Sequence, residues 1–152
     1  MKNQYRFYVD RELISGCSFI AGPELGYQLG RILRLADGDT VSLFGRNKKE
    51  YITRIAFHGR EITLTPLTDI TESREPEVRL TLLLALSKKD KPEYQVQKCT
   101  ELGAAGFIFV CSQRSVARPS DTNSRLDRLA RIAAEASEQC GRLSVPDIRF
   151  SQ

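Results

Sequence analysis

The sequence predicts a mixed α+β and α/β protein of two small domains, residues 1–72 and 73–152. Residues 4–70 are expected to form short strands with one helix, because apolar and polar side chains alternate in the first run and the later runs are rich in apolar, β-branched and aromatic residues. Residues 69–77 are polar, have no period and contain Pro76, as domain boundaries often do. Beyond them the pattern becomes strand, helix, strand, helix, strand, which predicts right-handed crossovers and a parallel sheet.

The N-terminal domain should be a small barrel of antiparallel strands. Apolar side chains occupy every second position over residues 5–9, which indicates the first strand. Three further runs are rich in apolar, β-branched and aromatic residues and indicate strands over 41–44, 51–57 and 61–67. Glycine-containing turns at residues 37–39 and 58–59 separate these runs.

One helix is expected between the first strand and the later ones. It should begin at Pro23, because proline is favoured at the first helical position. Its apolar face would comprise Leu25, Leu29, Ile32 and Leu33. Gly26 and Gly30 lie inside this helix, where each glycine costs about 0.5–1 kcal/mol relative to alanine. That cost makes sense if the helix backbone closely approaches another strand or an RNA.

The polar side of the same helix carries a first candidate binding site. Tyr27, Arg31 and Arg34 are spaced by four and three residues and would share one face. Two guanidinium groups beside an aromatic ring suit contact with phosphates and stacking of a base. The alternative interpretation is an ordinary solvated helix face.

The second domain is expected to begin with a buried strand over residues 80–86, whose nearly continuous apolar run is typical of a strand covered on both faces. The elements that follow are a helix over 92–103, a strand over 107–111, a helix over 124–140 and a strand over 145–150. Gly103 and Gly141 suit the left-handed caps that end helices. Three strands and two helices would leave apolar surface exposed, so a second copy or further sequence should cover it.

Composition narrows the possible functions. With 41% hydrophobic and 28% charged residues, the chain of 152 residues should fold as a globular protein. No apolar run reaches the roughly 20 residues that span a bilayer, and no secretory signal begins the chain, so we expect a cytoplasmic protein with no membrane partner. His58 is the only histidine and the four cysteines are dispersed, so no metal is expected. A net charge of +4 permits a phosphate-rich partner.

Basic residues follow the predicted strands of the second domain. Lys88, Lys89 and Lys91 come directly after the first buried strand, and Arg114 comes after the second. Ligands of open α/β sheets gather at the carboxyl ends of the strands. The lysines could therefore engage RNA phosphates, and Arg114 could reach a phosphate or a carbonyl edge. A solvated loop and a structural arginine are the alternatives.

Polar residues also mark the two helices of this domain. Gln97, Lys98 and Glu101 lie within one turn of the first helix, and Lys98 can pair with Glu101, although surface electrostatics alone could account for them. In the second helix the arginines come early and the glutamates late, which opposes the helix dipole and hints at a specific surface. A salt-bridged surface is the alternative. Gln139 and Arg142 lie at the end of that helix.

Taken together, these blocks resemble the bacterial 16S ribosomal RNA (uracil-N3)-methyltransferases of the SPOUT superfamily, over almost the whole chain. Residues 29–34 with the turn at 37–39 resemble the family's barrel helix and its exit turn. Lys98 with residues 101–103 resembles the hallmark of the first methyltransferase helix. The hallmark of the second helix is matched by Glu135, Gln139, Gly141 and Arg142. The chain departs from the family pattern at Gln28, where relatives often carry histidine, and at Val110, where many carry proline.

The resemblance implies a PUA-like RNA-binding β-barrel over residues 1–72 and part of a SPOUT (α/β knot) methyltransferase domain over 73–152. It implies S-adenosylmethionine-dependent methylation of N3 of a uridine in 16S rRNA of the small ribosomal subunit, carried out by a homodimer. The implied RNA-binding candidates are Arg6, Tyr27, Arg31, Arg34, Lys88, Lys89, Lys91, Arg114, Gln139 and Arg142. The family-motif positions are Gln97, Lys98, Glu101 and Glu135.

The resemblance also implies that the cofactor site lies elsewhere. The family's Gly-Pro-Glu-Gly-Gly loop and its later Arg-x-Glu-Thr segment should follow residue 152, so no cofactor-binding or catalytic residue is assigned within the chain. We therefore expect the N-terminal part of an enzyme, inactive by itself. The alternative is a non-catalytic RNA-binding protein that retains the barrel and a partial α/β scaffold.

Overall fold

The computed structural model describes residues 5–85, 91–111 and 122–151. The chain forms two compact units, Met1–Glu72 and Ser73–Gln152. Lys88, Lys89 and Arg114, three of the predicted binding residues, lie outside the described ranges. No described helix combines the length and the apolar character that crossing a membrane requires.

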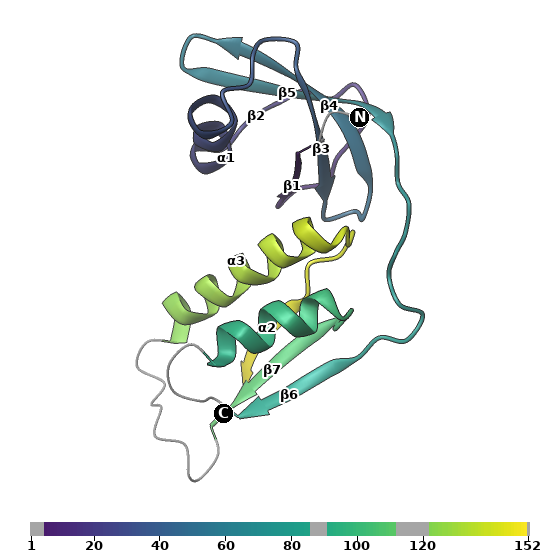
Figure 1. Cartoon of the computed structure of the whole chain (residues 1–152), viewed down its shortest axis with the longest axis vertical. Coiled ribbons are helices and arrows are strands. Elements are labelled where there is room, and N and C mark those ends of the chain that lie inside the picture. The colour runs from purple at the N-terminus through teal and green to yellow at the C-terminus, as the bar shows by residue number, and fades with distance from the viewer. Residues whose placement is uncertain (1–4, 86–90, 112–121, 152) are drawn as a thin grey trace. The chain divides into compact units, whose positions relative to one another are not determined.

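The first unit is a curled sheet of five strands with one helical segment beside it (Figure 1). The strands are β1 (Arg6–Val9), β2 (Phe19–Ile20), β3 (Thr40–Gly45), β4 (Glu50–His58) and β5 (Glu61–Asp69), in the order β1-β3-β4-β5-β2. Their side chains enclose a core that includes Leu13, Val41, Leu43, Ile55 and Leu64.

The prediction of a purely antiparallel barrel is wrong for the first strand. β1 pairs in parallel with β3, with Phe7 opposite Leu43. A parallel pair requires a long crossover, and residues 10–39, which contain β2 and the helical segment, provide it. β3, β4 and β5 pair antiparallel as predicted.

The helical segment changes its geometry halfway. A short α-helix, α1 (Pro23–Tyr27), continues directly into a π-helical turn, η1 (Gln28–Ile32). The backbone N–H of Leu33 donates to the carbonyl of Gln28, five residues back, so the turn is wider than an α-helical one. Leu29 is fully buried as predicted, but the wider turn leaves Ile32 exposed, so its assignment to the apolar face is wrong.

The second unit is a three-stranded parallel sheet in the order β6 (Thr81–Ala85), β7 (Gly106–Val110) and β8 (Asp147–Ser151). Two helices, α2 (Lys91–Glu101) and α3 (Thr122–Cys140), pack on each other and on the sheet (Figure 1). Gly103 and Gly141 follow them with positive φ of 97° and 79°, which confirms both predicted helix ends.

Both helices cover the same face of this sheet. Leu82, Phe107, Phe109 and Ile148 point toward Val96 of α2 and Leu129 of α3 in one apolar core. Right-handed crossovers that step in one direction along a sheet place their helices on one side, which accounts for this arrangement. Among the described residues the opposite face is uncovered, and Leu83 is exposed there. The predicted exposed apolar face is therefore found, and its covering by a second copy or by further sequence stays a prediction.

Candidate functional site

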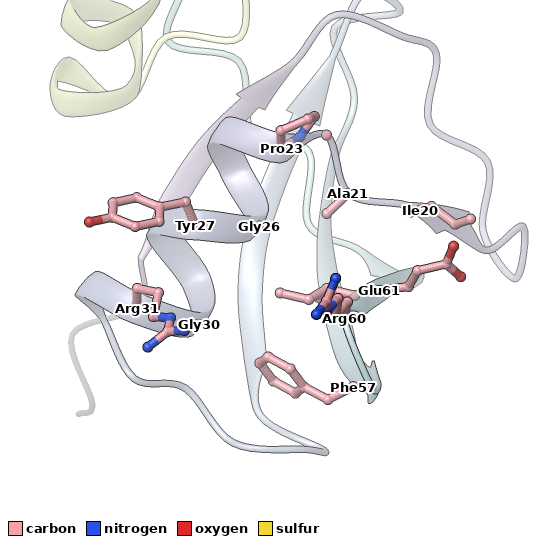
Figure 2. Close-up of a pocket in the computed structure, with 13 residues that line it drawn as sticks. Ile20, Ala21, Pro23, Gly26, Tyr27, Gly30, Arg31, Phe57, Arg60 and Glu61 are labelled. Atoms are coloured by element: carbon pink, nitrogen blue, oxygen red, sulfur yellow. The ribbon is translucent and has the colours of Figure 1, made fainter.

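An open groove of about 590 Å³ lies in the first unit, between the helical segment and the β4–β5 hairpin (Figure 2). Gly26 and Gly30 form its helical wall, and Phe57 and Ile62 face them from the two strands. Arg31 lies at one rim and Arg60, in the hairpin turn, at the other. The groove thus combines an apolar floor with cationic edges.

The two wall glycines are not required by the backbone or by the packing. Neither adopts a positive φ. A Cβ added at Gly26 would lie 3.7 Å from Cδ1 of Ile62, and one at Gly30 would lie 3.5 Å from Cε1 of Phe57. Both are ordinary van der Waals distances, so alanine would fit. The helix nevertheless carries the cost of two glycines, roughly 0.5–1 kcal/mol each relative to alanine.

The predicted stripe of Tyr27, Arg31 and Arg34 is only partly formed. Tyr27 and Arg31 both line the groove, and the Tyr27 ring, 62% exposed, projects from the helix away from the strands (Figure 2). Arg34 lies beyond the end of η1 with a left-handed φ of 52°, so the three residues do not share one helical face. The π-helical turn is the cause, because it ends the helix before Arg34 and changes the angular spacing of its last residues.

The cationic edges of the groove are accessible, and the described residues offer them no partner. Arg31 and Arg60 are exposed, and neither forms a hydrogen bond or an ion pair with another residue in the described part of the chain. Sequence reasoning did not identify Arg60, Phe57 or Ile62. Their joint position depends on how the hairpin faces the helix, which no local pattern reveals.

Arg6, another predicted RNA contact, is engaged within the first unit. Its Nε donates to Oε1 of Glu50 at 2.9 Å, and its guanidinium lies 3.9 Å from the centre of the Phe44 ring. The hydroxyl of Ser42 donates to the same carboxylate. With these contacts in place, Arg6 stabilises the pairing of β1, β3 and β4, and its contact with RNA stays a prediction.

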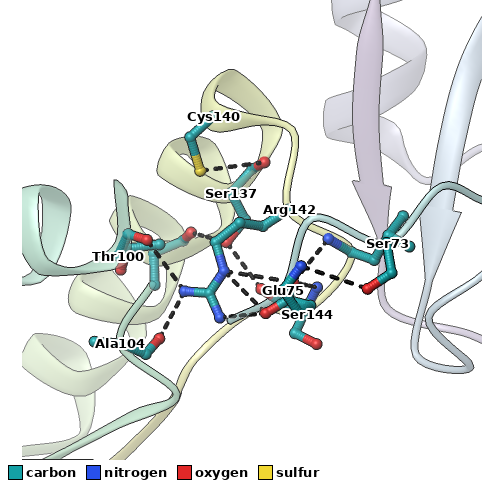
Figure 3. Close-up of polar contacts among 10 residues, drawn as sticks. Ser73, Glu75, Thr100, Ala104, Ser137, Cys140, Arg142 and Ser144 are labelled. Carbon is teal, nitrogen blue, oxygen red and sulfur yellow. Dashed lines mark hydrogen bonds and ion pairs between the residues drawn. The ribbon is translucent and has the colours of Figure 1, made fainter. Parts of the chain in front are cut away.

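Arg142 is the centre of a buried polar cluster in the second unit (Figure 3). Its Nη1 donates to the carbonyls of Thr100 and Ala104, at 3.1 and 2.6 Å. Its Nη2 donates to Oε2 of Glu75 at 2.7 Å. Arg142 therefore joins the end of α2 to the chain segment that precedes β6.

Glu75 completes this cluster. Its Oε1 accepts hydrogen bonds from the backbone N–H groups of Leu143 and Ser144, at 3.0 and 2.9 Å. Burial raises the pKa of the Glu75 carboxyl, but the hydrogen bonds from Arg142 and from these N–H groups together outweigh burial and hold the pKa below its usual value. Sequence reasoning placed Glu75 in a polar boundary segment and missed this role. The predicted approach of Arg142 to the substrate remains untested, and its observed contacts are structural.

The remaining predicted positions lie on the helices. Lys98 and Glu101 form the expected ion pair on α2, with Nζ 2.9 Å from Oε1. Gln97 is exposed on the same helix, Lys91 is exposed at its start, and Glu135 and Gln139 are exposed on α3. Their side chains are accessible, but no contact among the described residues assigns them a chemical role.

A cofactor site is not defined by the described residues. β6 and β7 run at their carboxyl ends into residues 86–90 and 112–121, so the sheet edge at which α/β proteins commonly hold nucleotide-like ligands is mostly outside the described ranges. No group of three or more His, Cys, Asp or Glu side chains that could hold a metal ion occurs within those ranges.

Curated relatives match the chain along most of its length. It is 32% identical over 148 residues to ribosomal RNA small subunit methyltransferase E of Synechocystis, a match that covers 95% of this chain and 46% of that protein. The Bacillus subtilis protein of the same name is 29% identical over 132 residues, covering 85% of this chain and 51% of the relative. The chain thus spans about half the length of the curated relatives it matches.

Solved structures show the same fold. The crystal structure of ribosomal RNA small subunit methyltransferase E from Neisseria gonorrhoeae, bound to S-adenosyl methionine, superposes with a TM-score of 0.88 at 25% identity, covering 98% of this chain and 63% of that one. A putative methyltransferase from Legionella pneumophila in complex with the same cofactor gives a TM-score of 0.89 at 25% identity. The match covers 99% of this chain and 63% of that one. Residues 74–152, just over half of the chain, match the model of the RNA methyltransferase domain, and the chain belongs to that family.

Proposed function

We propose that the protein is an S-adenosylmethionine-dependent ribosomal RNA methyltransferase that modifies N3 of a uridine in 16S rRNA. The observation that carries the proposal is the family match over residues 74–152. The structural likeness to methyltransferases solved with S-adenosyl methionine supports it, because that likeness extends over both units. A homodimer acting on the small ribosomal subunit in the cytoplasm is part of the same proposal.

In this proposal the two units divide the work. The first unit, as a PUA-like domain, holds RNA chiefly through its phosphates, and Arg31 and Arg60 are its accessible cations at the groove. The second unit is the start of the SPOUT domain. Its sheet is held by the core around Phe107 and by the cluster of Glu75 and Arg142.

The chemistry sets clear requirements. S-adenosylmethionine supplies a methyl group on a sulfonium. Uracil N3 normally carries a proton, so it must lose that proton before its electron pair can bond to the methyl carbon. The carbon–sulfur bond would break at the same time, and its electron pair would stay on the sulfur of the departing S-adenosylhomocysteine. The base must also leave its stack and align with the methyl group. The residues of this chain contribute by binding and orienting the RNA. None of them is assigned as the group that accepts the N3 proton.

Methyl transfer separates this proposal from the rival, a non-catalytic RNA-binding protein. The protein, produced from its complete reading frame, is incubated with S-adenosylmethionine labelled in the methyl group and with small ribosomal subunits that lack the modification. We expect label in 16S rRNA and 3-methyluridine after nuclease digestion. RNA binding without any transfer of label would favour the rival. Label in another nucleoside would retain the methyltransferase but refute the N3 position.

Calorimetry tests where the cofactor binds. The 152-residue chain is titrated with S-adenosylmethionine. If the cofactor site requires sequence beyond residue 152, the titration should give no heat of binding. Saturable binding would place the site within this chain.

A further inference from the structure

We propose that the groove between the helical segment and the β4–β5 hairpin holds one unpaired nucleotide of RNA. Its base would lie against Phe57 and Ile62, and its phosphates would meet Arg31 and Arg60. The inference rests on the proposed function, because the RNA is the strand that the protein methylates. It goes further by assigning a nucleotide subsite to the first unit.

The size of the groove suits a single nucleotide. Its volume of about 590 Å³ lies within the range of roughly 300–1,000 Å³ typical of sites for small organic ligands. A duplex is far too wide for such a site, whereas a flipped or unpaired base can enter it.

The wall of the groove supports the same occupant. Alanine at Gly26 or Gly30 would meet Ile62 and Phe57 only at ordinary contact distance, so the fold accepts a methyl group there. That methyl group would stand on the helical wall of the groove, in contact with Ile62 or Phe57, and would reduce the space that a ligand can occupy there. The glycines, which the fold itself does not explain, are explained if this space must stay open for a ligand.

The charges at the rim select a phosphate-bearing ligand. Arg31 and Arg60 approach from the helix and from the hairpin, and neither is neutralised by another described residue. Glu61 also lines the groove, but its carboxylate points away from the helix (Figure 2). Guanidinium groups match phosphate oxygens in a bidentate geometry, and the half-buried Phe57 ring offers a surface for base stacking.

The backbone beside the groove argues against an added peptide strand. The carbonyl of Ile62 already accepts the N–H of Ala21 at 2.8 Å, and Thr63 pairs with Ile20 of β2. The edge of β5 at this level is therefore occupied. A peptide could not extend the sheet here, which leaves side-chain and base contacts as the means of recognition.

The test uses the 152-residue chain and a short, uridine-rich, fluorescein-labelled single-stranded RNA, with fluorescence anisotropy as the readout. The variant Gly26→Ala with Gly30→Ala should retain or raise the melting temperature but weaken binding about tenfold, the effect of losing one stacked base. Gln28→Ala, in the same helical segment but not lining the groove, is the matched control and should bind like the unmodified chain.

Charge variants test the phosphate contacts. Arg31→Ala and Arg60→Ala should each lower the slope of log affinity against log salt by about 0.7, the value for one phosphate contact to a single strand. Arg54→Ala removes the same charge from an exposed site of β4 outside the groove and should leave the slope unchanged. Shifts of the Ile62 methyl resonance on adding uridine 5′-monophosphate would locate the base directly.

The outcomes separate this inference from the proposed function. Glycine variants that bind RNA as well as the unmodified chain would overturn the nucleotide subsite, even if the protein methylates 16S rRNA. Tighter binding of a duplex than of the single strand would overturn it too. If methyl transfer fails while the glycine and arginine variants weaken RNA binding as expected, the subsite stands and the catalytic proposal falls.

Discussion

Replacing Glu75 with glutamine should destabilise the second unit by about 3 kcal/mol. Glutamine removes the charge that faces the Arg142 guanidinium, whose side chain is only 5% exposed. It also leaves one carbonyl oxygen for the N–H groups of Leu143 and Ser144, which now use Oε1 of Glu75. Removing one partner of a buried ion pair costs about 3–5 kcal/mol. Because Glu75 is 22% exposed and water can reach the site, we expect the lower end of that range.

The assay is urea unfolding of the 152-residue chain, followed for each unit separately by hydrogen exchange of its backbone amides. Separate readouts are needed because two units need not unfold together. The matched control is Asp10→Asn, which breaks the ion pair with Arg46 in the first unit, where the side chains are 67% and 61% exposed. Losing this exposed ion pair should lower the free energy of unfolding of the first unit by only about 0–1 kcal/mol. A Glu75→Gln variant as stable as the control variant would refute the reasoning.

The pH dependence gives a second readout of the same contact. The pKa of Glu75 is lower in the folded protein than the usual glutamate value of 4.5. Its stabilisation is therefore complete above pH 4.5 and is lost as the pH falls through the lower folded pKa. The second unit should lose stability in this acid range more steeply than the Glu75→Gln variant does. If the free energy of unfolding of the second unit falls equally steeply with pH in both proteins, the stabilising role assigned to the Glu75 carboxylate is contradicted.

Three further predictions follow from local geometry and are measured by thermal or urea unfolding. Arg34→Gly should stabilise the first unit by up to about 1 kcal/mol, because glycine adopts the left-handed φ of 52° without strain, and a loss of stability would contradict this. Gly45→Ala should destabilise the first unit by about 1–3 kcal/mol, because the added Cβ would overlap the carbonyl oxygen of Arg11. An unchanged midpoint of unfolding would contradict this prediction. Lys98→Ala should cost less than about 0.5 kcal/mol, because its pair with Glu101 is exposed, and a larger loss would reveal a contact beyond that pair.

Regular elements were predictable from the sequence because their signals are local. The alternating run at residues 5–9 predicted β1, the apolar and β-branched runs predicted the longer strands, and Gly103 and Gly141 marked the ends of α2 and α3. The π-helical turn was missed because its spacing differs from the α-helical period that the apolar pattern suggests. The parallel pairing of β1 with β3 was missed because pairing depends on contacts between segments far apart in sequence.

The candidate site was predictable only in part. Tyr27 and Arg31 were identified because aromatic and basic residues recur on one helix, and the cost of Gly26 and Gly30 was noted from the sequence alone. Phe57 and Arg60 complete the groove from another part of the chain, and nothing near them in sequence signals that role. Glu75 was likewise hidden in a polar segment, because its function depends on a distant arginine.

The most direct test of the central claim is nucleoside mass spectrometry of 16S rRNA from cells in which the gene encoding this chain is deleted. The account predicts that 3-methyluridine disappears from 16S rRNA and returns when the gene is restored. A deletion strain that retains the full amount of 3-methyluridine in its 16S rRNA would contradict the proposed methyltransferase function.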